Sequence, residues 1–112
     1  MRIYTDHNGV AVNAISKTHD GQDVEGHLYQ VLSGSKVQEI AFQLGPVKDA
    51  GVNGATNEAV LAALIHRLHF LNGKFPCREN SLAITKMQEA LMWLEKRTAD
   101  RVARGIEGQN VA

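Results

Sequence analysis

The stretch CRENSLAITKMQEALMWLEKRTADRVARG, residues 77–105, decides the fold. It contains no proline, and its one glycine, Gly105, stands where a left-handed residue commonly ends a helix. Nothing therefore interrupts a helix of about 28 residues, which would be on the order of 40 Å long. Apolar residues recur along it every three or four positions and give one apolar face: Ile84, Met87, Leu91 and Leu94. The sequence predicts one long amphipathic helix.

A shorter helix precedes the long one. Thr56 or Asn57 can cap its start. Apolar residues follow at helical spacing: Val60, Leu61, Leu64, Ile65 and Leu68. We expect this helix to end near Leu71, because Asn72-Gly73 can take a left-handed conformation, and we expect Pro76 to begin the long helix. Two amphipathic helices joined by a short link predict an antiparallel hairpin, which leaves part of the long helix for solvent, the sheet or another subunit.

The first half of the chain has the pattern of strands and turns. Three turn signals occur in it: His7-Asn8-Gly9, His19-Asp20-Gly21 and Ser33-Gly34-Ser35. The strands expected between them form a four-stranded meander that includes residues 2–6, 10–15, 28–32 and 36–42, whereas 24–28 is too mixed to assign. Gly, Pro and Asn residues at 45–54 mark a connection. The predicted fold is α+β, with a small antiparallel sheet at 1–50 followed by a helical hairpin at 51–112.

The composition is that of an ordinary small globular protein. Hydrophobic residues make up 44% and charged residues 21% of 112 residues, which argues against disorder. Twelve basic residues balance twelve acidic ones, so the chain lacks the positive field typical of proteins that bind DNA or RNA polymers. A chain of this size buries a modest core, which favours association into a dimer or a larger assembly.

Cysteine content and hydropathy exclude further classes. Cys77 is the only cysteine, so an internal disulfide and a multi-cysteine metal site are excluded, and we expect its thiol to be buried. The first residues lack the apolar core of a signal peptide, and no stretch approaches the ~20 apolar residues that span a bilayer. We expect a cytoplasmic protein without a membrane partner.

Arg97, Arg101 and Arg104 stand at i, i+4 and i+7, which places three guanidinium groups on one helical face. Two interpretations stay open. The arginines can interact with the helix C-terminus and pair with nearby carboxylates, namely those of Glu95, Asp100 or Glu107. Alternatively, they form a stripe that binds an anion, since guanidinium donors match phosphate oxygens. Trp93, one turn earlier, is either a core or interface aromatic or a stacking platform.

The link between the helices is rich in aromatic and polar side chains. Phe70 and Phe75 can plug the end of the hairpin, or they can stack on a base. Arg78 and Asn80 offer hydrogen-bond donors, and Asn80 also an acceptor, beside these rings. The link is therefore a second candidate region for ligand binding.

The sequence indicates neither catalysis nor a cofactor. His66 and His69 are three residues apart, but no third ligand accompanies them, so we expect no metal site. Cys77 has no convincing histidine–carboxylate arrangement, and the glycines at 51–54 lack the spacing of a phosphate-binding loop. We expect no catalytic residue and no cofactor.

Five runs of residues resemble one family. They are GPVK at 45–48, GVNGATNEA at 51–59, CREN at 77–80, EALMWLEKRT at 89–98 and DRVARG at 100–105. These runs are similar to the Thoeris anti-defence proteins of phages, which share their hairpin domain with the anti-CBASS cyclic-nucleotide sponge. The resemblance covers residues 36–108 and is weaker over the first 30 residues.

The resemblance implies a homodimer, or a hexamer built as a trimer of dimers, that acts in the host bacterial cytoplasm. Such a protein sequesters glycocyclic ADP-ribose signals of TIR-domain defence enzymes without cleaving them, in pockets at the dimer interface. The resemblance also implies that Phe70 stacks on a base, that Asn80 hydrogen-bonds the base or a ribose, and that Arg97 and Arg101 hold the pyrophosphate. Neighbouring candidates complete the site: Phe75, Arg78 and Arg104. Some relatives also bind cyclic trinucleotides at a second site.

Two other functions are weighed against capture of a signal. The first is a small hydrolase that degrades the same signal. The second is a protein–protein inhibitor of a host defence enzyme, with the arginine face as its interface. Recovery of intact ligand separates capture from hydrolysis, and binding to the small molecule alone separates capture from direct inhibition.

Overall fold

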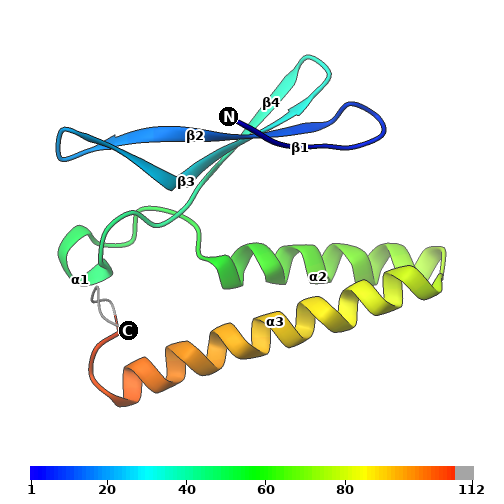
Figure 1. The fold of residues 1–112 in the computed structure, drawn as a ribbon. Helices are drawn as coiled ribbons and strands as arrows, with labels where there is room; N and C mark the ends of the chain where they lie inside the picture. Colours follow the sequence, from blue (N-terminus) through cyan, green and yellow to red (C-terminus); the bar gives the residue numbers. More distant parts are fainter. Residues whose placement is uncertain (108–112) are drawn as a thin grey trace. The chain divides into compact units, whose positions relative to one another are not determined.

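The computed structural model describes residues 1–107, and the chain divides into two compact units, Met1–Ala55 and Thr56–Ala112. Residues 108–112, at the end of the predicted helical region 51–112, lie outside the described residues. The elements confirm the predicted α+β class, with strands in the first unit and the two long helices in the second (Figure 1). No helix among the described residues is both long and apolar enough to cross a membrane.

The first unit contains an antiparallel sheet in the order β1-β2-β3-β4, which confirms the predicted meander (Figure 1). The strands are β1 (Arg2–Thr5), β2 (Ala11–His19), β3 (Gln22–Ser33) and β4 (Lys36–Ala41). Asp20 and Gly21 both have positive φ, 53° and 76°, at the predicted turn between β2 and β3. A tight turn of this type matches the twist of the flanking strands.

Strand β3 begins at Gln22 and so includes the residues that the sequence pattern left unassigned. The cause is an irregularity in the ladder, whose register shifts between Ile15 and Lys17 of β2. Gly26, on the facing part of β3, has a φ of 85°, a conformation that glycine adopts without steric cost. A bulge of this kind interrupts the alternation of side chains, which explains why the pattern at 24–28 could not be assigned.

The segment between β4 and the helices is an ordered connection that contains one short helical turn, α1 (Val47–Ala50). The Gln43 side chain donates to the carbonyls of Gly45 and Gly51, at 3.1 and 2.7 Å. Asn53 bonds both backbone groups of Leu44: its Oδ1 accepts from the N–H at 2.9 Å, and its Nδ2 donates to the carbonyl at 2.7 Å. Two amide side chains therefore hold the connection together by hydrogen bonds to its backbone, including both polar groups of the buried Leu44.

Gly54 lies where two stretches of backbone meet. Phe42 and Ala55 form a parallel bridge, and a Cβ at Gly54 would lie 2.5 Å from the Phe42 carbonyl carbon. Real Cβ atoms do not approach backbone so closely. Only glycine fits this position without a shift of the chain.

The second unit is the predicted hairpin of two antiparallel helices, α2 (Asn57–Lys74) and α3 (Arg78–Ala103) (Figure 1). Thr56 caps α2 as expected, because its hydroxyl accepts a hydrogen bond from the Ala59 N–H at 3.1 Å. Every third or fourth residue of α3 is half-buried or buried, in a stripe that follows a seven-residue repeat. This stripe comprises Asn80, Ile84, Met87, Leu91, Leu94, Thr98 and Arg101.

The predicted end of the shorter helix is wrong. Helix α2 continues through Asn72-Gly73 to Lys74, and Gly73 is not in the left-handed region. The Asn72 side chain accepts from the Cys77 N–H at 2.9 Å and donates to Ser81 Oγ at 3.1 Å, so it fastens the link to α3. Phe75 is the residue that leaves the helix, with φ −134° and ψ 76°, because the following proline disfavours the helical conformation.

Two expectations about the start of α3 are also wrong. Pro76 does not begin the helix: Cys77 is the N-cap, and Arg78 is the first helical residue. The Cys77 thiol is exposed instead of buried, and its sulfur accepts a hydrogen bond from the Asn80 N–H at 3.4 Å. A cysteine here takes the place of the usual serine or aspartate at a helix start.

Gly105 ends α3 as the sequence predicts. Its φ is 73°, its N–H donates to the Val102 carbonyl, and the Ile106 N–H donates to the Arg101 carbonyl, both at 3.0 Å. This pair of bonds is the Schellman motif, in which a left-handed glycine turns the chain back on the last helical turn. The residues after Gly105 are thereby brought close to Arg101.

Candidate ligand-binding site

The three arginines of the predicted stripe have different environments. Arg101 is 3% exposed, and its Nε donates to a Glu107 carboxylate oxygen at 3.2 Å. Its Nη2 donates to the Ile106 carbonyl, also at 3.2 Å. Arg104 is exposed, and its Nη1 lies 3.4 Å from the Asp100 carboxylate. The interpretation as charges paired near the helix end therefore describes Arg101 and Arg104 in this structure.

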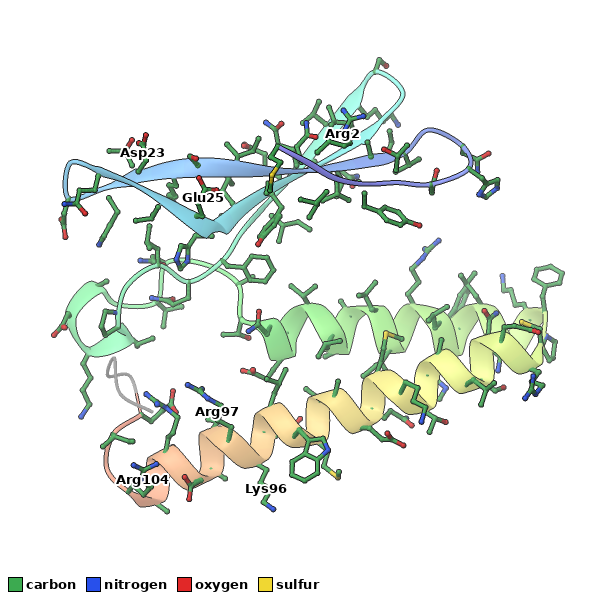
Figure 2. All side chains as sticks on the ribbon, in the orientation of Figure 1. Arg2, Asp23, Glu25, Lys96, Arg97 and Arg104 are labelled. Atoms are coloured by element: carbon green, nitrogen blue, oxygen red, sulfur yellow. The ribbon has the colours of Figure 1, made fainter. Side chains whose placement is uncertain are left out.

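Arg97 differs from the other two. It is exposed, and within residues 1–107 its guanidinium has no hydrogen-bond or ion-pair partner. Arg97 and the adjacent Lys96 extend from opposite sides of α3 (Figure 2). The ammonium group of Lys96 lies 5.1 Å from the centre of the Trp93 ring, which is 61% exposed. Five guanidinium donors of Arg97 are consequently available to an anionic ligand.

The aromatic residues near the link do not plug the hairpin. Phe70, in the last turns of α2, is 58% exposed, and Phe75, just after α2, is 77% exposed. The ammonium group of Lys74 lies over one face of the Phe70 ring, 4.7 Å from its centre. A packed plug would have been buried, so neither ring plugs the end of the hairpin in this structure.

Asn80 and Arg78 lie in the first turn of α3, at the same end of the hairpin as the two phenylalanines. Asn80 is half-buried at the start of the seam between the helices. Its backbone N–H bonds the Cys77 sulfur, and its side-chain amide has no hydrogen-bond partner in the described part of the chain. Arg78 is exposed beside it. The link end of the hairpin thus combines aromatic faces with amide and guanidinium groups.

The two groups of candidate residues lie far apart within one chain. Asn80 and Arg97 are separated by 17 positions of one continuous helix, which corresponds to about 26 Å. Phe70, Phe75, Arg78 and Asn80 belong to one end of the hairpin, and Arg97, Arg101 and Arg104 to the other. A single hairpin therefore does not bring all seven residues around one small molecule.

Of the two histidines near the link, His69 makes a contact between the two helices. His69 Nε2 lies 3.3 Å from the Gln88 side-chain nitrogen, a contact that joins α2 to α3. No group of three or more potential ligands among histidine, cysteine, aspartate and glutamate occurs in the described residues.

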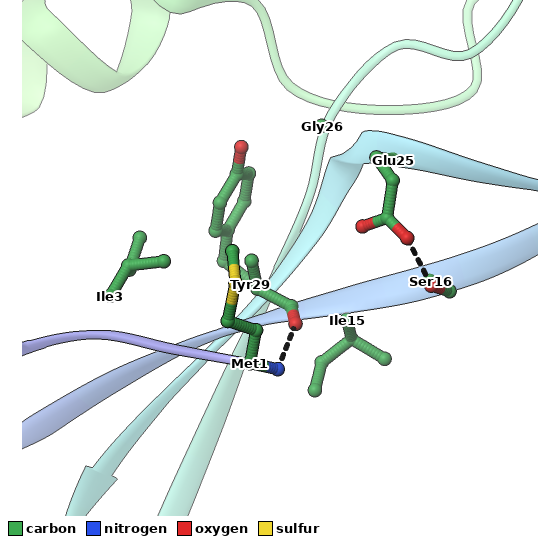
Figure 3. A pocket seen from close by; sticks show the side chains of 8 residues that line it. Met1, Ile3, Ile15, Ser16, Glu25, Gly26 and Tyr29 are labelled. Carbon is green, nitrogen blue, oxygen red and sulfur yellow. Dashed lines mark hydrogen bonds between the residues drawn. The ribbon is translucent and has the colours of Figure 1, made fainter.

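A hollow of about 530 Å³ lies on the sheet and involves none of the predicted residues (Figure 3). It is beside the bulge of β3, and the hydroxyl of Ser16 donates to the Glu25 carboxylate at its rim. Its apolar lining includes Met1, Ile3 and Ile15. The only signal in the sequence was Gly26 within an otherwise strand-like segment, which commonly marks a bulge.

Comparison with known proteins identifies two similarities. A family model described as the Acb2/Tad1 hairpin domain matches residues 35–99, more than half of the chain. A protein named Thoeris anti-defense 1, from Bacillus phage SBSphiJ7, is 57% identical over 74 residues. That alignment covers 65% of this chain and 52% of the relative, so the chain spans about half the length of the protein it matches. The range of the family model includes Arg97 and ends before Arg101.

Proposed function

Because the chain belongs to the Acb2/Tad1 hairpin family, we propose that it is a phage anti-defence protein that sequesters a nucleotide-type immune signal without cleaving it. The name of the Bacillus phage relative refers to defence by the Thoeris system, and this supports glycocyclic ADP-ribose as the first ligand to test. The site of action we propose is the cytoplasm of the infected bacterium, where such signals are made. Cyclic oligonucleotides are the second ligand class to test.

The separation of the two residue groups along α3 is the observation that carries this proposal. Aromatic faces and amide groups suit a base and a ribose, whereas an arginine without a protein partner suits a phosphate. A nucleotide signal needs all of these in one place. Since one hairpin holds them about 26 Å apart, the complete site requires a second copy of the chain.

A two-fold dimer would complete the site. When the two-fold axis is perpendicular to α3, the two copies of this helix run in opposite directions, and the link end of one hairpin can meet the arginine end of the other. Each interface then contains two identical sites, each built from both chains. We propose at least a homodimer, and the measurement of assembly described below also distinguishes a hexamer built as a trimer of dimers.

Capture without cleavage is consistent with the chemistry of these residues. Phenylalanine, asparagine and arginine bind a nucleotide strongly in its ground state and supply neither a nucleophile nor a general base at neutral pH. Binding the ground state tightly holds the ligand without accelerating its reaction. A sponge requires this property.

The decisive experiment is recovery of the ligand. Purified protein is incubated with glycocyclic ADP-ribose, separated from free ligand by gel filtration, denatured by heat and analysed by mass spectrometry of the released small molecules. We expect intact ligand in an amount close to one molecule per chain. Cleaved products would show a hydrolase, and an empty protein that still blocks defence in cells would show a direct inhibitor of a host enzyme. The variant Arg97→Ala, treated identically, is the control for specific retention.

A further inference from the structure

The buried guanidinium of Arg101 is occupied by the chain itself. Glu107 accepts a hydrogen bond from Nε, and the Ile106 carbonyl accepts one from Nη2. The left-handed Gly105 makes both contacts possible, because it turns the chain back over the last turn of α3. Both of these acceptors belong to the segment directly after the helix.

Glu107 offers Arg101 the same chemistry as a phosphate group. Carboxylate and phosphate oxygens accept the same charge-assisted hydrogen bonds from a guanidinium, so only one of them can use a given donor. The two side chains of the pair are unequally buried: Arg101 is 4% exposed and Glu107 is 40% exposed. Glu107 can therefore move into water at moderate cost, whereas Arg101 is held in place.

We propose that Glu107 is an internal competitor for Arg101, which it neutralises in the empty protein and yields to a phosphate group of the captured ligand. This inference rests on the proposed function, because it assigns a regulatory contact to the same site. A buried guanidinium is stabilised by a negative charge beside it, and in the empty protein the Glu107 carboxylate supplies one. The carboxylate keeps Arg101 in place and at the same time lowers the affinity of the site for weakly held anions.

The first test removes the competing charge. Glu107→Gln keeps the size of the side chain and abolishes its negative charge. Glu95→Gln is the matched control, since Glu95 is an exposed carboxylate on the helix that carries Arg101 and has no partner in residues 1–107. We expect Glu107→Gln to bind glycocyclic ADP-ribose roughly two- to fivefold more tightly than the parent, in the range of a partly exposed ion pair, and Glu95→Gln to match the parent. Equal affinities for the two variants, or weaker binding by Glu107→Gln, would overturn the proposal.

The second test uses a probe that contains no nucleotide. Inorganic pyrophosphate is titrated into protein labelled with ¹⁵N, and the Nε–H resonance of Arg101 is followed by NMR. We expect this resonance to shift in the parent and to shift at lower pyrophosphate concentration in Glu107→Gln. If the resonance shifts in this way while glycocyclic ADP-ribose fails to bind, the proposed function is wrong, but the role of Glu107 as a competitor for Arg101 is supported. No shift in either protein would refute the competitor independently of the nucleotide result.

A third measurement locates the effect on Arg101. In the Arg101→Ala background, Glu107→Gln should leave ligand affinity unchanged, because the donors for which it competes are gone. Tighter binding in that background would mean that Glu107 acts on another cation, which contradicts the proposal. Melting curves of all variants accompany the titrations. If Arg101→Ala does not fold, the NMR comparison of the parent with Glu107→Gln decides alone.

Discussion

Lys96 and Arg97 are adjacent residues of α3 with the same charge, and they extend from opposite sides of the helix (Figure 2). Lys96 lies over the Trp93 ring, whereas Arg97 has no partner among residues 1–107. The pair therefore separates the effect of a positive charge from the effect of its position. An equal change of net charge is obtained by replacing either one.

Arg97→Ala should weaken binding of glycocyclic ADP-ribose by tenfold or more. Charge-assisted hydrogen bonds contribute about 1.5–3 kcal/mol each, and about 1.4 kcal/mol corresponds to a factor of ten in the dissociation constant. The helix should persist, since alanine is the best helix former. Isothermal titration calorimetry measures the effect, with Lys96→Ala as the control that keeps the affinity of the parent. If Lys96→Ala weakens binding as much as Arg97→Ala does, the positive charge and not the position of Arg97 matters, and the assignment of Arg97 to a phosphate is wrong.

Phe70→Ala should weaken binding while the protein remains stable. The ring is 58% exposed, so its removal leaves no cavity, and the melting temperature should stay within a few degrees of the parent. Loss of base stacking costs about 1–3 kcal/mol, which titration resolves readily. Ile84→Ala is the contrasting variant, because Ile84 is buried and its truncation should cost about 2–5 kcal/mol of stability. Normal ligand affinity in folded Phe70→Ala would remove this residue from the site.

At the scale of the elements, Gly54 and Gly73 differ in the space around them: a side chain does not fit at Gly54 but fits at Gly73. A Cβ at Gly54 would meet the Phe42 carbonyl group at 2.5 and 2.6 Å. At Gly73, inside α2, a Cβ would meet nothing within 4 Å, and the backbone there is helical. One of these glycines is required by close packing of backbone, and the other lowers the stability of a helix.

Alanine substitutions at these two positions should change stability in opposite directions. Gly54→Ala should destabilise the protein by about 1–3 kcal/mol, the usual cost of forcing an atom into a filled space. Gly73→Ala should stabilise it by roughly 0.5–1 kcal/mol, because alanine loses less backbone entropy in a helix. Urea unfolding followed by circular dichroism measures both. If Gly54→Ala leaves the free energy of unfolding unchanged, the backbone of the connection between β4 and α2 can shift at little cost.

The elements also show what the sequence can and cannot predict. Thr56 and Gly105 were identified correctly because each acts through its own hydrogen bonds or backbone conformation. The predicted helix end at Asn72-Gly73 is wrong because the Asn72 side chain bonds Cys77 and Ser81. These partners lie too far along the chain for the conformational preferences of Asn and Gly to indicate the bonds. Strand β3 was read only in part because the bulge at Gly26 interrupts its alternation.

The sequence supplies candidate site residues by type but does not show how they are arranged. Helical spacing placed the three arginines on one face, and that arrangement agrees with α3. Spacing could not show that Arg101 pairs with Glu107 while Arg97 stays exposed, because the difference depends on the turn after Gly105. In the site we propose, the arrangement of the seven candidate residues also depends on a second chain, about which the periodicity of one chain contains no information.

At the scale of the whole molecule, the described residues form a very small core. Three apolar residues among them are buried, namely Ala11, Leu44 and Ile84. Large apolar side chains are exposed on both helices, among them Leu64, Leu82 and Met92. Small chains gain stability by burying such surface against other copies of themselves. The exposed apolar residues and the divided site favour the same conclusion, a complex of identical chains.

Light scattering coupled to gel filtration should therefore give a mass at least twice the 12.3 kDa of one chain at micromolar concentration. A sixfold mass would indicate a trimer of dimers. Leu82→Glu, which places a charge on an exposed apolar position of α3, tests whether that position is covered in the complex, and Lys86→Glu provides a charge change at an already polar position nearby. A monomer that binds the ligand with full affinity would contradict the two-chain site.

The exposed Trp93 provides the protein with an intrinsic fluorescence probe. It is the only tryptophan in the chain, it is 61% exposed, and it lies one helical turn before Arg97. Indole emission moves to shorter wavelength when water is excluded from the ring, and a nearby adenine quenches it. Dilution of the protein and addition of a signal molecule should each change this emission, in ways that differ in wavelength and intensity. This emission therefore provides a test of the proposed assembly and of the proposed capture on the unlabelled chain.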